Sequence, residues 1–145
     1  MKPEVYFDTS ALAKWYLNEA LSEEVEGFLL EHGPVAISDL TRVEMRSLLA
    51  RHRREKQIDA RMESKIFATF SEDIRRGHLV CHPLMAGLAA GAINMLALLP
   101  EHPLRTLDAL HLVIAQEIGA DRLATSDRVM ATSARALGMT VIKFW

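Results

Sequence analysis

Short runs of apolar residues alternate along the chain with longer segments in which apolar residues recur every three or four positions. The short runs are rich in β-branched and aromatic residues and are typical of buried strands, whereas the longer segments are typical of amphipathic helices. The pattern predicts strands at residues 5–7, 35–37, 79–82, 122–125 and 140–144. It predicts helices at residues 11–18, 21–30, 40–56, 58–76, 84–99, 107–118 and 128–137.

This alternation predicts an α/β fold, in which helices cover both faces of a central, mainly parallel sheet of about four to five strands. The 145 residues suit a single domain, residues 1–145, with enough chain to bury a core. The apolar run at residues 84–99 contains Asn94 and is shorter than the roughly 20 residues that span a bilayer. We therefore expect it to form a buried helix, and we expect no membrane segment.

Charge and cysteine content indicate the cellular compartment of the protein and the kind of partner that it can bind. A net charge of -2 and a pI of about 6.3 argue against binding of nucleic acid by bulk charge, so a polyanion must be held by a local patch or through metal ions. Cys81 is the only cysteine and forms no internal disulfide. The residues before Asp8 contain no long apolar segment of the kind found in signal peptides. We expect a cytoplasmic protein.

Acidic residues lie where predicted strands meet predicted helices. Asp8 directly follows the first strand, and Asp127 follows the fourth through Thr125 and Ser126. Glu44 lies in the first turns of the helix after the second strand, and Asp108 lies at the start of the helix at residues 107–118. Because parallel sheets gather the carboxyl ends of their strands at one edge, we expect these carboxylates to converge there.

Each of these acids also has an ordinary structural explanation. Asp8 and Asp127 are suited to capping the helices that follow them, and Asp108 complements a helix dipole. Thr41 and Glu44 match the capping-box pattern. Together, however, four like charges at one edge repel one another unless a cation lies between them. A set of oxygen donors alone favours Mg²⁺ or Mn²⁺ over zinc.

Four fragments of the chain, in this order, resemble the PIN-domain ribonucleases, and most closely the VapC toxins of bacterial and archaeal toxin–antitoxin pairs. They are Val-Tyr-Phe-Asp8-Thr-Ser-Ala-Leu, Ser38-Asp-Leu-Thr-Arg-Val-Glu44, Thr106-Leu-Asp108-Ala-Leu-His111-Leu and Leu-Ala-Thr125-Ser-Asp127-Arg-Val-Met. The resemblance covers nearly the whole chain and implies a PIN-like three-layer α/β/α sandwich.

The resemblance also implies an activity, which is metal-dependent endonuclease cleavage of RNA phosphodiesters by a metal-activated water. The ion would be Mg²⁺ or Mn²⁺. Asp8 and Asp108 would be its firmest ligands, while Glu44 and Asp127 would bind it through water or complete a second site. All four acids would form the catalytic cluster.

Hydroxyl and basic side chains extend the expected site. Hydroxyls beside the acids either orient carboxylates and water or cap helices, and they belong to Thr9, Ser10, Thr125 and Ser126. His111 either contacts the site or a phosphate, or is a hydrogen-bonded packing residue, and the second reading is favoured. The expected RNA-binding residues are Arg42, Arg46 and Arg51, within a basic set that also includes Arg53 and Arg54. A solvated helix face is the alternative for this set.

The family resemblance implies protein partners as well. Its toxins are usually silenced by a cognate VapB-like antitoxin whose peptide covers the acidic site, and they often form homodimers. Two other functions fit the sequence, namely a PIN nuclease that processes RNA without a toxin role and a non-catalytic PIN-like binding module. Magnesium-dependent phosphatases and receiver-like phosphoacceptors fit less well, because Ser10 stands where such a phosphatase needs a second Asp.

Overall fold

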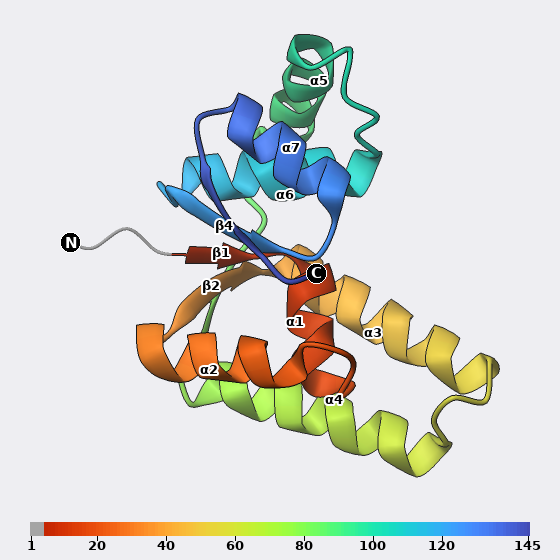
Figure 1. Ribbon diagram of the computed structural model, residues 1–145. Coiled ribbons are helices and arrows are strands. Elements are labelled where there is room, and N and C mark those ends of the chain that lie inside the picture. Colours follow the sequence, from red (N-terminus) through yellow and green to blue (C-terminus); the bar gives the residue numbers. More distant parts are fainter. Residues whose placement is uncertain (1–4) are drawn as a thin grey trace.

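The computed structural model describes residues 5–145 and contains a five-stranded sheet in the order β3-β2-β1-β4-β5 (Figure 1). Every neighbouring pair of strands is parallel, as predicted. The strands are β1 (Val5–Phe7), β2 (Val35–Ser38), β3 (Leu79–His82), β4 (Arg122–Thr125) and β5 (Thr140–Lys143). The helices are α1 (Thr9–Tyr16), α2 (Ser22–His32), α3 (Asp39–Arg54), α4 (Ala60–Arg75), α5 (Leu88–Leu98), α6 (Thr106–Glu117) and α7 (Arg128–Ala136).

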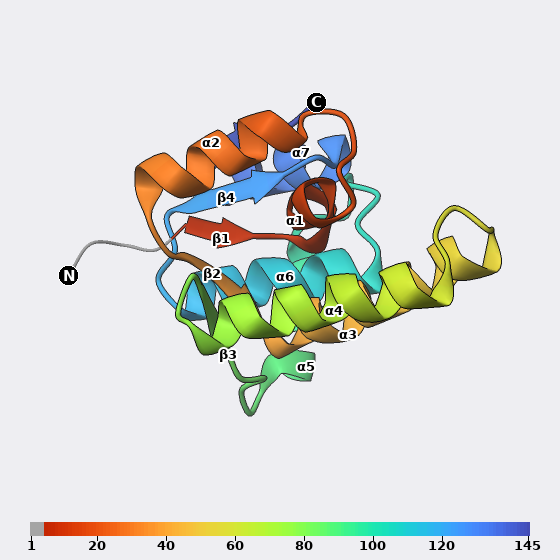
Figure 2. The same cartoon turned by 90° about the horizontal axis from the view of Figure 1, so that it is seen from below.

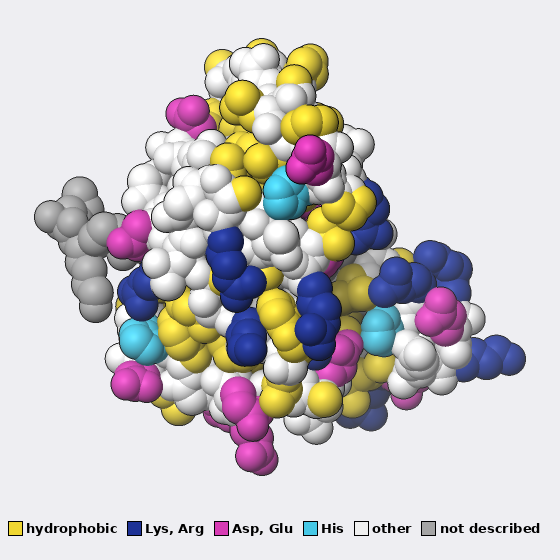
Figure 3. Space-filling model, turned by 45° about the horizontal axis from the view of Figure 1, so that its top comes forward, with side chains coloured by type: hydrophobic (Ala, Val, Ile, Leu, Met, Phe, Trp, Pro, Cys, Tyr) yellow, Lys and Arg dark blue, Asp and Glu magenta, His cyan; other side chains and the backbone are white. Residues whose placement is uncertain are grey.

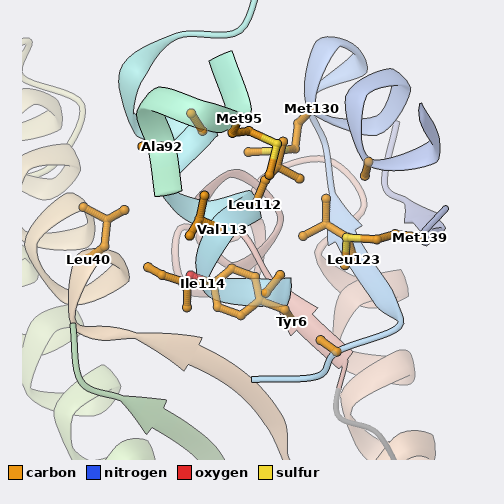
Figure 4. Packing of buried hydrophobic residues seen from close by; sticks show 14 of the residues in the cluster. Tyr6, Leu40, Ala92, Met95, Leu112, Val113, Ile114, Leu123, Met130 and Met139 are labelled. Atoms are coloured by element: carbon orange, nitrogen blue, oxygen red, sulfur yellow. The ribbon is translucent and has the colours of Figure 1, made fainter. Parts of the chain in front are cut away.

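Helices cover both faces of the sheet, so the predicted three-layer sandwich is confirmed. The helices α5, α6 and α7 lie on one face and α1, α2 and α4 on the other, while the far ends of α3 and α4 form an arm that projects past the sheet (Figures 1 and 2). Two buried apolar clusters fill the two layers. One lies between the sheet and α6 (Figure 4), and the other lies between the sheet and α1.

Local capping explains why several helix boundaries differ from the predicted ones. The first helix begins at Thr9 because the Asp8 side chain accepts a hydrogen bond from the backbone N–H of Ala11. The fourth begins at Ala60 because Asp59 caps it in the same way. The fifth begins only after Gly87, whose φ of +83° is a left-handed conformation that favours glycine.

The prediction that residues 84–99 form a buried helix is wrong for most of α5. Only Ala92 and Met95 of this helix are buried, and Gly91 packs so closely on α6 that an added Cβ would lie 2.8 Å from Val113 Cγ1. Other apolar residues of this helix are exposed, including Ile93 at 68% and Leu98 at 72%. Among residues 5–145, no helix combines the length and apolar character that crossing a membrane requires.

The strand order places two chain segments with acidic residues next to each other. β1 pairs with β4 in a register that sets Phe7 opposite Ala124, and the N–H of Asp8 extends this pairing to the carbonyl of Ala124 at 3.0 Å. From β1 the chain moves outward to β2 and β3 on one side, and it later returns to β4 on the other. Such a reversal of strand order creates a crevice at the carboxyl edge, which is where open α/β sheets bind ligands.

Candidate active site

Asp8 lies at the carboxyl end of β1 and is almost fully buried, with 3% of its surface exposed. Its Oδ1 accepts hydrogen bonds from Ser10 Oγ at 2.6 Å and from the Ala11 N–H at 3.1 Å, and its Oδ2 accepts one from Thr125 Oγ1 at 2.5 Å. Burial raises the pKa of Asp8, although these hydrogen bonds act in the opposite direction. Asp8 is therefore both a helix cap and a carboxylate that is costly to ionise without a nearby cation.

The junction between β4 and α7 is hydrogen-bonded to the junction between β1 and α1. Thr125 Oγ1 donates to Asp8 and accepts from the N–H of Asp127 at 2.9 Å, while Ser10 Oγ accepts from the N–H of Ser126 at 3.1 Å. Asp127 Oδ1 caps α7 by accepting from the N–H groups of the next turn. The hydroxyls of Ser10 and Thr125, two of those predicted beside the acids, thus hold the two junctions together, while Ser126 takes part through its backbone N–H.

Glu44 lies on α3, and its Oε1 accepts hydrogen bonds from Thr9 Oγ1 at 2.8 Å and from His111 Nε2. The capping-box explanation of Glu44 is wrong, because Thr41 instead forms the box with Ser38 at the start of this helix. Burial acts to raise the pKa of Glu44, but the contacts with His111 and Thr9 hold it below its usual value. Glu44 is therefore ionised at neutral pH and fixed through one oxygen.

Asp108 lies in the first turn of α6, where its Oδ2 accepts a hydrogen bond from the N–H of Arg105 at 3.2 Å. The Arg105 guanidinium lies 3.6 Å from Asp108 Oδ2 and 3.7 Å from Asp127 Oδ2. It also helps to lower the pKa of Glu44. Arg105 is thus a cation beside three of the four predicted acids, and it was not among the site residues predicted from the sequence.

A cavity of about 590 Å³ opens over this group of residues, where the arm of α3 and α4 leaves the body. We call it the acidic cavity. Its lining includes Glu44 and Asp108, and Asp8 is connected to it through its neighbours Thr9 and Ser10. Basic side chains line the same cavity, namely Arg51, Arg54 and Arg105. Figure 3 shows Lys and Arg side chains along this arm and at its junction with the body.

The three arginines predicted to bind RNA do not lie together. Arg51 lines the acidic cavity, whereas Arg42 and Arg46 line a different surface hollow, next to Phe67. Arg42 pairs with Asp39, and Arg46 pairs with Glu63 of α4. Arg53 also pairs with Glu63, so this side of α3 is an interface with the arm's second helix.

The residues at the acidic cavity fit a hard divalent ion. Across residues 5–145, no three or more His, Cys, Asp and Glu side chains form a ready-made ligand set. Mg²⁺ commonly uses one or two carboxylates and keeps several waters, and two carboxylates on one cavity meet that requirement. The guanidinium of Arg105 already lies between Asp108 and Asp127, so this position accommodates positive charge. The donors are oxygens, which suits Mg²⁺ or Mn²⁺ better than zinc.

Asp8→Asn is expected to raise the melting temperature of the metal-free protein by about 3 °C, which corresponds to about 1 kcal/mol. Asn keeps an oxygen for the Ala11 N–H and can donate to Thr125, but it carries no buried charge. Because the folded-state pKa of Asp8 is raised, its contribution to the free energy of unfolding falls as the pH rises through that pKa. The gain should therefore be larger at pH about 8 than at pH about 4.

Thermal unfolding in the presence of a chelator measures this effect. The control is Asp121→Asn, because Asp121 is an exposed carboxylate that pairs only at 3.9 Å with Arg122. A melting temperature that Asp8→Asn leaves unchanged or lowers at both pH values would contradict the view that the Asp8 carboxylate is a source of instability.

Comparisons with known proteins identify relatives of this chain. The family model described as PIN domain matches residues 5–136. The chain is 36% identical to Ribonuclease VapC46 of Mycobacterium tuberculosis over an alignment of 141 positions that covers 95% of each protein. Among solved structures it is similar to VapC20 of Mycobacterium tuberculosis, described as a sarcin-ricin loop cleaving toxin, with a TM-score of 0.70, 18% identity and coverage of 90% of this chain and 95% of that one. It is also similar to DNA-bound VapBC of Salmonella typhimurium, with a TM-score of 0.70, 16% identity and coverage of 98% of both chains.

Proposed function

Because the chain belongs to the PIN-domain family, we propose that it is a VapC-type endoribonuclease that cleaves RNA phosphodiesters with a bound Mg²⁺ or Mn²⁺ ion. The observation that carries this proposal is the acidic cavity. Glu44 and Asp108 line it, and Asp8 and Asp127 lie at the neighbouring β1–α1 and β4–α7 junctions, in a chain 36% identical over 95% of its length to a ribonuclease. The five strands, drawn from both ends of the chain, belong to one sheet, which supports a single domain over the 145 residues.

The ion would be held by Asp8, Glu44, Asp108 and Asp127, directly or through water. When bound, it supplies positive charge that activates water and offsets the charge that builds on the phosphate. The protein's own contribution is to fix the carboxylates. Thr9 holds Glu44, and Ser10 and Thr125 hold Asp8. Arg105 is placed to move from Asp108 and Asp127 to a phosphate oxygen, since guanidinium groups bind phosphate well.

Replacing Arg51 and Arg54 together with Ala is expected to weaken RNA binding. Both side chains are exposed and line the acidic cavity, so each is placed to neutralise one phosphate of a strand entering it. Two lost phosphate contacts should lower the slope of log affinity against log salt by about 1.4 for single-stranded RNA. Fluorescence anisotropy with a labelled RNA and a cleavage-deficient protein measures this slope. The matched control is the pair Arg75→Ala and Arg76→Ala at the C-terminal end of α4, which do not line the cavity, and equal slopes for both double variants would contradict the prediction.

We also propose two protein partners, a VapB-like antitoxin and a second copy of the chain. One of the similar structures is an antitoxin complex by name, the DNA-bound VapBC of Salmonella typhimurium. The second copy is supported by the exposed apolar side chains on and near α5, seen at the top of Figure 3. They include Leu84, Ile93, Leu96 and Leu98. Apolar side chains gathered in one exposed region are typical of interaction surfaces.

The test of the proposed activity is cleavage of total cellular RNA by purified, antitoxin-free protein with and without Mn²⁺ or Mg²⁺. We expect metal-dependent cuts at a few discrete sites, absent from the Asp8→Asn and Asp108→Asn variants. If the wild-type protein makes no cuts beyond those that the two variants also make, the nuclease proposal is overturned. Induced expression then separates a toxin, which arrests growth, from a nuclease that processes RNA without a toxin role.

A further inference from the structure

Two polar side chains lie inside the apolar cluster between the sheet and α6. Tyr6 projects from β1 into this cluster, next to Ile114 of α6 (Figure 4), and is 0% exposed. His111 of α6 is 2% exposed, and its ring centroid lies 5.7 Å from that of Tyr6. Burying a phenol and an imidazole is costly unless both find hydrogen-bond partners. Apolar side chains could fill the same space without the cost of burying polar groups. The hydrogen-bond partners of Tyr6 and His111 therefore indicate what the two polar side chains do there.

The pair belongs to a chain of hydrogen bonds that leads from the start of α3 to the acidic cavity. The Tyr6 hydroxyl lies 2.9 Å from Ser38 Oγ and 2.7 Å from His111 Nδ1. The other ring nitrogen, Nε2, is hydrogen-bonded to Glu44 Oε1. A buried tyrosine is thereby connected through one imidazole to a carboxylate of the proposed active site.

When Glu44 is ionised and His111 is neutral, the donors and acceptors along this chain have only one consistent direction. Ser38 Oγ accepts from a backbone N–H in the capping box of α3, so its own hydrogen is available to the Tyr6 oxygen. The Tyr6 hydrogen is then donated to His111 Nδ1. Because a carboxylate only accepts, Nε2 must carry the hydrogen that His111 shares with Glu44. By donating to Nδ1, Tyr6 favours the same tautomer, in which Nε2 donates to Glu44.

The consequence for Glu44 is a fixed orientation. His111 and Thr9 both donate to Oε1, so the second oxygen, Oε2, is the one that these contacts leave for a ligand in the acidic cavity. A glutamate side chain without such contacts has several rotatable bonds and samples many orientations. Partners of this kind behind a metal-binding carboxylate are known to contribute to affinity for the ion.

We propose that Tyr6 and His111 are positioning residues, and that Tyr6 acts through the tautomer of His111 to hold Glu44 ready for a divalent ion. This inference rests on the proposed metal-dependent function. Tyr6→Phe removes one hydroxyl and leaves the ring packing in place. It is expected to weaken Mn²⁺ binding by about 10-fold and to lower RNA cleavage without unfolding the protein.

The chain offers a matched control in its second tyrosine. The hydroxyl of Tyr16 donates to Asp73 at 2.5 Å between α1 and α4, and it is not part of the hydrogen-bond chain through Tyr6 and His111. Tyr16→Phe also removes a partly buried phenol hydroxyl, but it should leave Mn²⁺ affinity unchanged. At position 111, His111→Gln keeps a donor for Glu44, whereas His111→Leu keeps none. We expect His111→Gln to retain more Mn²⁺ affinity than His111→Leu, which should lose about 100-fold.

Two measurements on the full chain decide the proposal. Mn²⁺ titration followed by electron paramagnetic resonance gives the affinities, and ¹⁵N NMR of the histidine side chains gives the tautomer of His111, assigned by comparison with His111→Gln. We expect the neutral Nε2–H form in the wild type and its partial loss in Tyr6→Phe. Wild-type His111 in any other form overturns the proposal that Tyr6 acts through the His111 tautomer. Equal effects of Tyr6→Phe and Tyr16→Phe on Mn²⁺ binding overturn it as well. Wild-type protein that binds neither Mn²⁺ nor Mg²⁺ overturns the proposed function, whatever the tautomer.

Discussion

Replacing Asp108 with Asn is expected to lower the rate of RNA cleavage by about 10³-fold or more while the protein remains folded. Asp108 lines the acidic cavity, and its charge is the property that an Asn cannot supply to an ion. The fold should survive, because the carbonyl oxygen of an Asn still accepts the hydrogen bond from the N–H of Arg105. A loss of several kcal/mol of charge stabilisation corresponds to the stated factor.

The control for this variant is Glu117→Gln, which removes a carboxylate from the exposed far end of the same helix. Rates are measured on one RNA at saturating Mn²⁺, and binding of the ion is measured separately. Cleavage by Asp108→Asn within about 10-fold of the wild type would show that this carboxylate is not part of the catalytic cluster. If cleavage is lost while Mn²⁺ binding is unchanged, Asp108 acts on the RNA substrate rather than by holding the ion.

The positions of the four acids were predictable because they follow from topology. Asp8, Glu44 and Asp127 lie at or after a junction between a strand and a helix, and parallel strands bring such junctions to one edge, whereas Asp108 lies in the first turn of α6. The positions of the residues between the acids were harder to predict from the sequence. The position of Arg105 beside both Asp108 and Asp127 depends on how α6 lies relative to α7, which no local pattern specifies.

Tyr6 and His111 show the same limit for buried polar residues. Tyr6 stands between Val5 and Phe7 in a short strand and has the pattern of an ordinary core residue. Its hydroxyl needs partners once buried, but they lie 32 and 105 positions away in the sequence. His111 was expected to be a hydrogen-bonded packing residue rather than one that contacts the site, but it is both, since it is buried against Tyr6 and also hydrogen-bonded to Glu44.

The separation of Arg51 from Arg42 and Arg46 could have been predicted from the sequence. Arg51 follows Glu44 by about two helical turns and therefore lies on the same side of α3, at the acidic cavity. Arg42 and Arg46 are two positions before and after Glu44, and a helix turns such positions to the opposite side. They lie next to Asp39 and Glu63 instead. Helical phase applied to the basic set would have separated the arginine at the cavity from those at the interface with α4.

The exposed face of α5 was missed for a different reason. Its composition is apolar on all sides, which predicts burial if every apolar surface must be covered within one chain. In the structure one side packs on α6 through Gly91 and Ala92, and the other remains at the surface. A sequence pattern records that a side chain is apolar but not whether the same chain or another molecule covers it.

Replacing Phe70 with Ala is expected to lower the free energy of unfolding by about 3 to 5 kcal/mol. Phe70 is the apolar residue of α4 that is fully buried, and it fills the cluster between the sheet and α1. Its ring meets the edge of Tyr16 with centroids 5.4 Å apart and also contacts Phe67. Truncation to Ala leaves a cavity that these rigid aromatic neighbours fill poorly, so the cost should lie near the upper end for core substitutions.

The arm of α3 and α4 depends on this contact, since Phe70 joins α4 to the body of the protein while the far ends of both helices project beyond the sheet. Chemical denaturation measures the change in free energy, and the melting temperature should fall by roughly 10 °C. The control is Met62→Ala on the same helix, where the residue is 46% exposed and a change within about 0.5 kcal/mol is expected. Equal destabilisation by the two substitutions would mean that α4 is not anchored through Phe70.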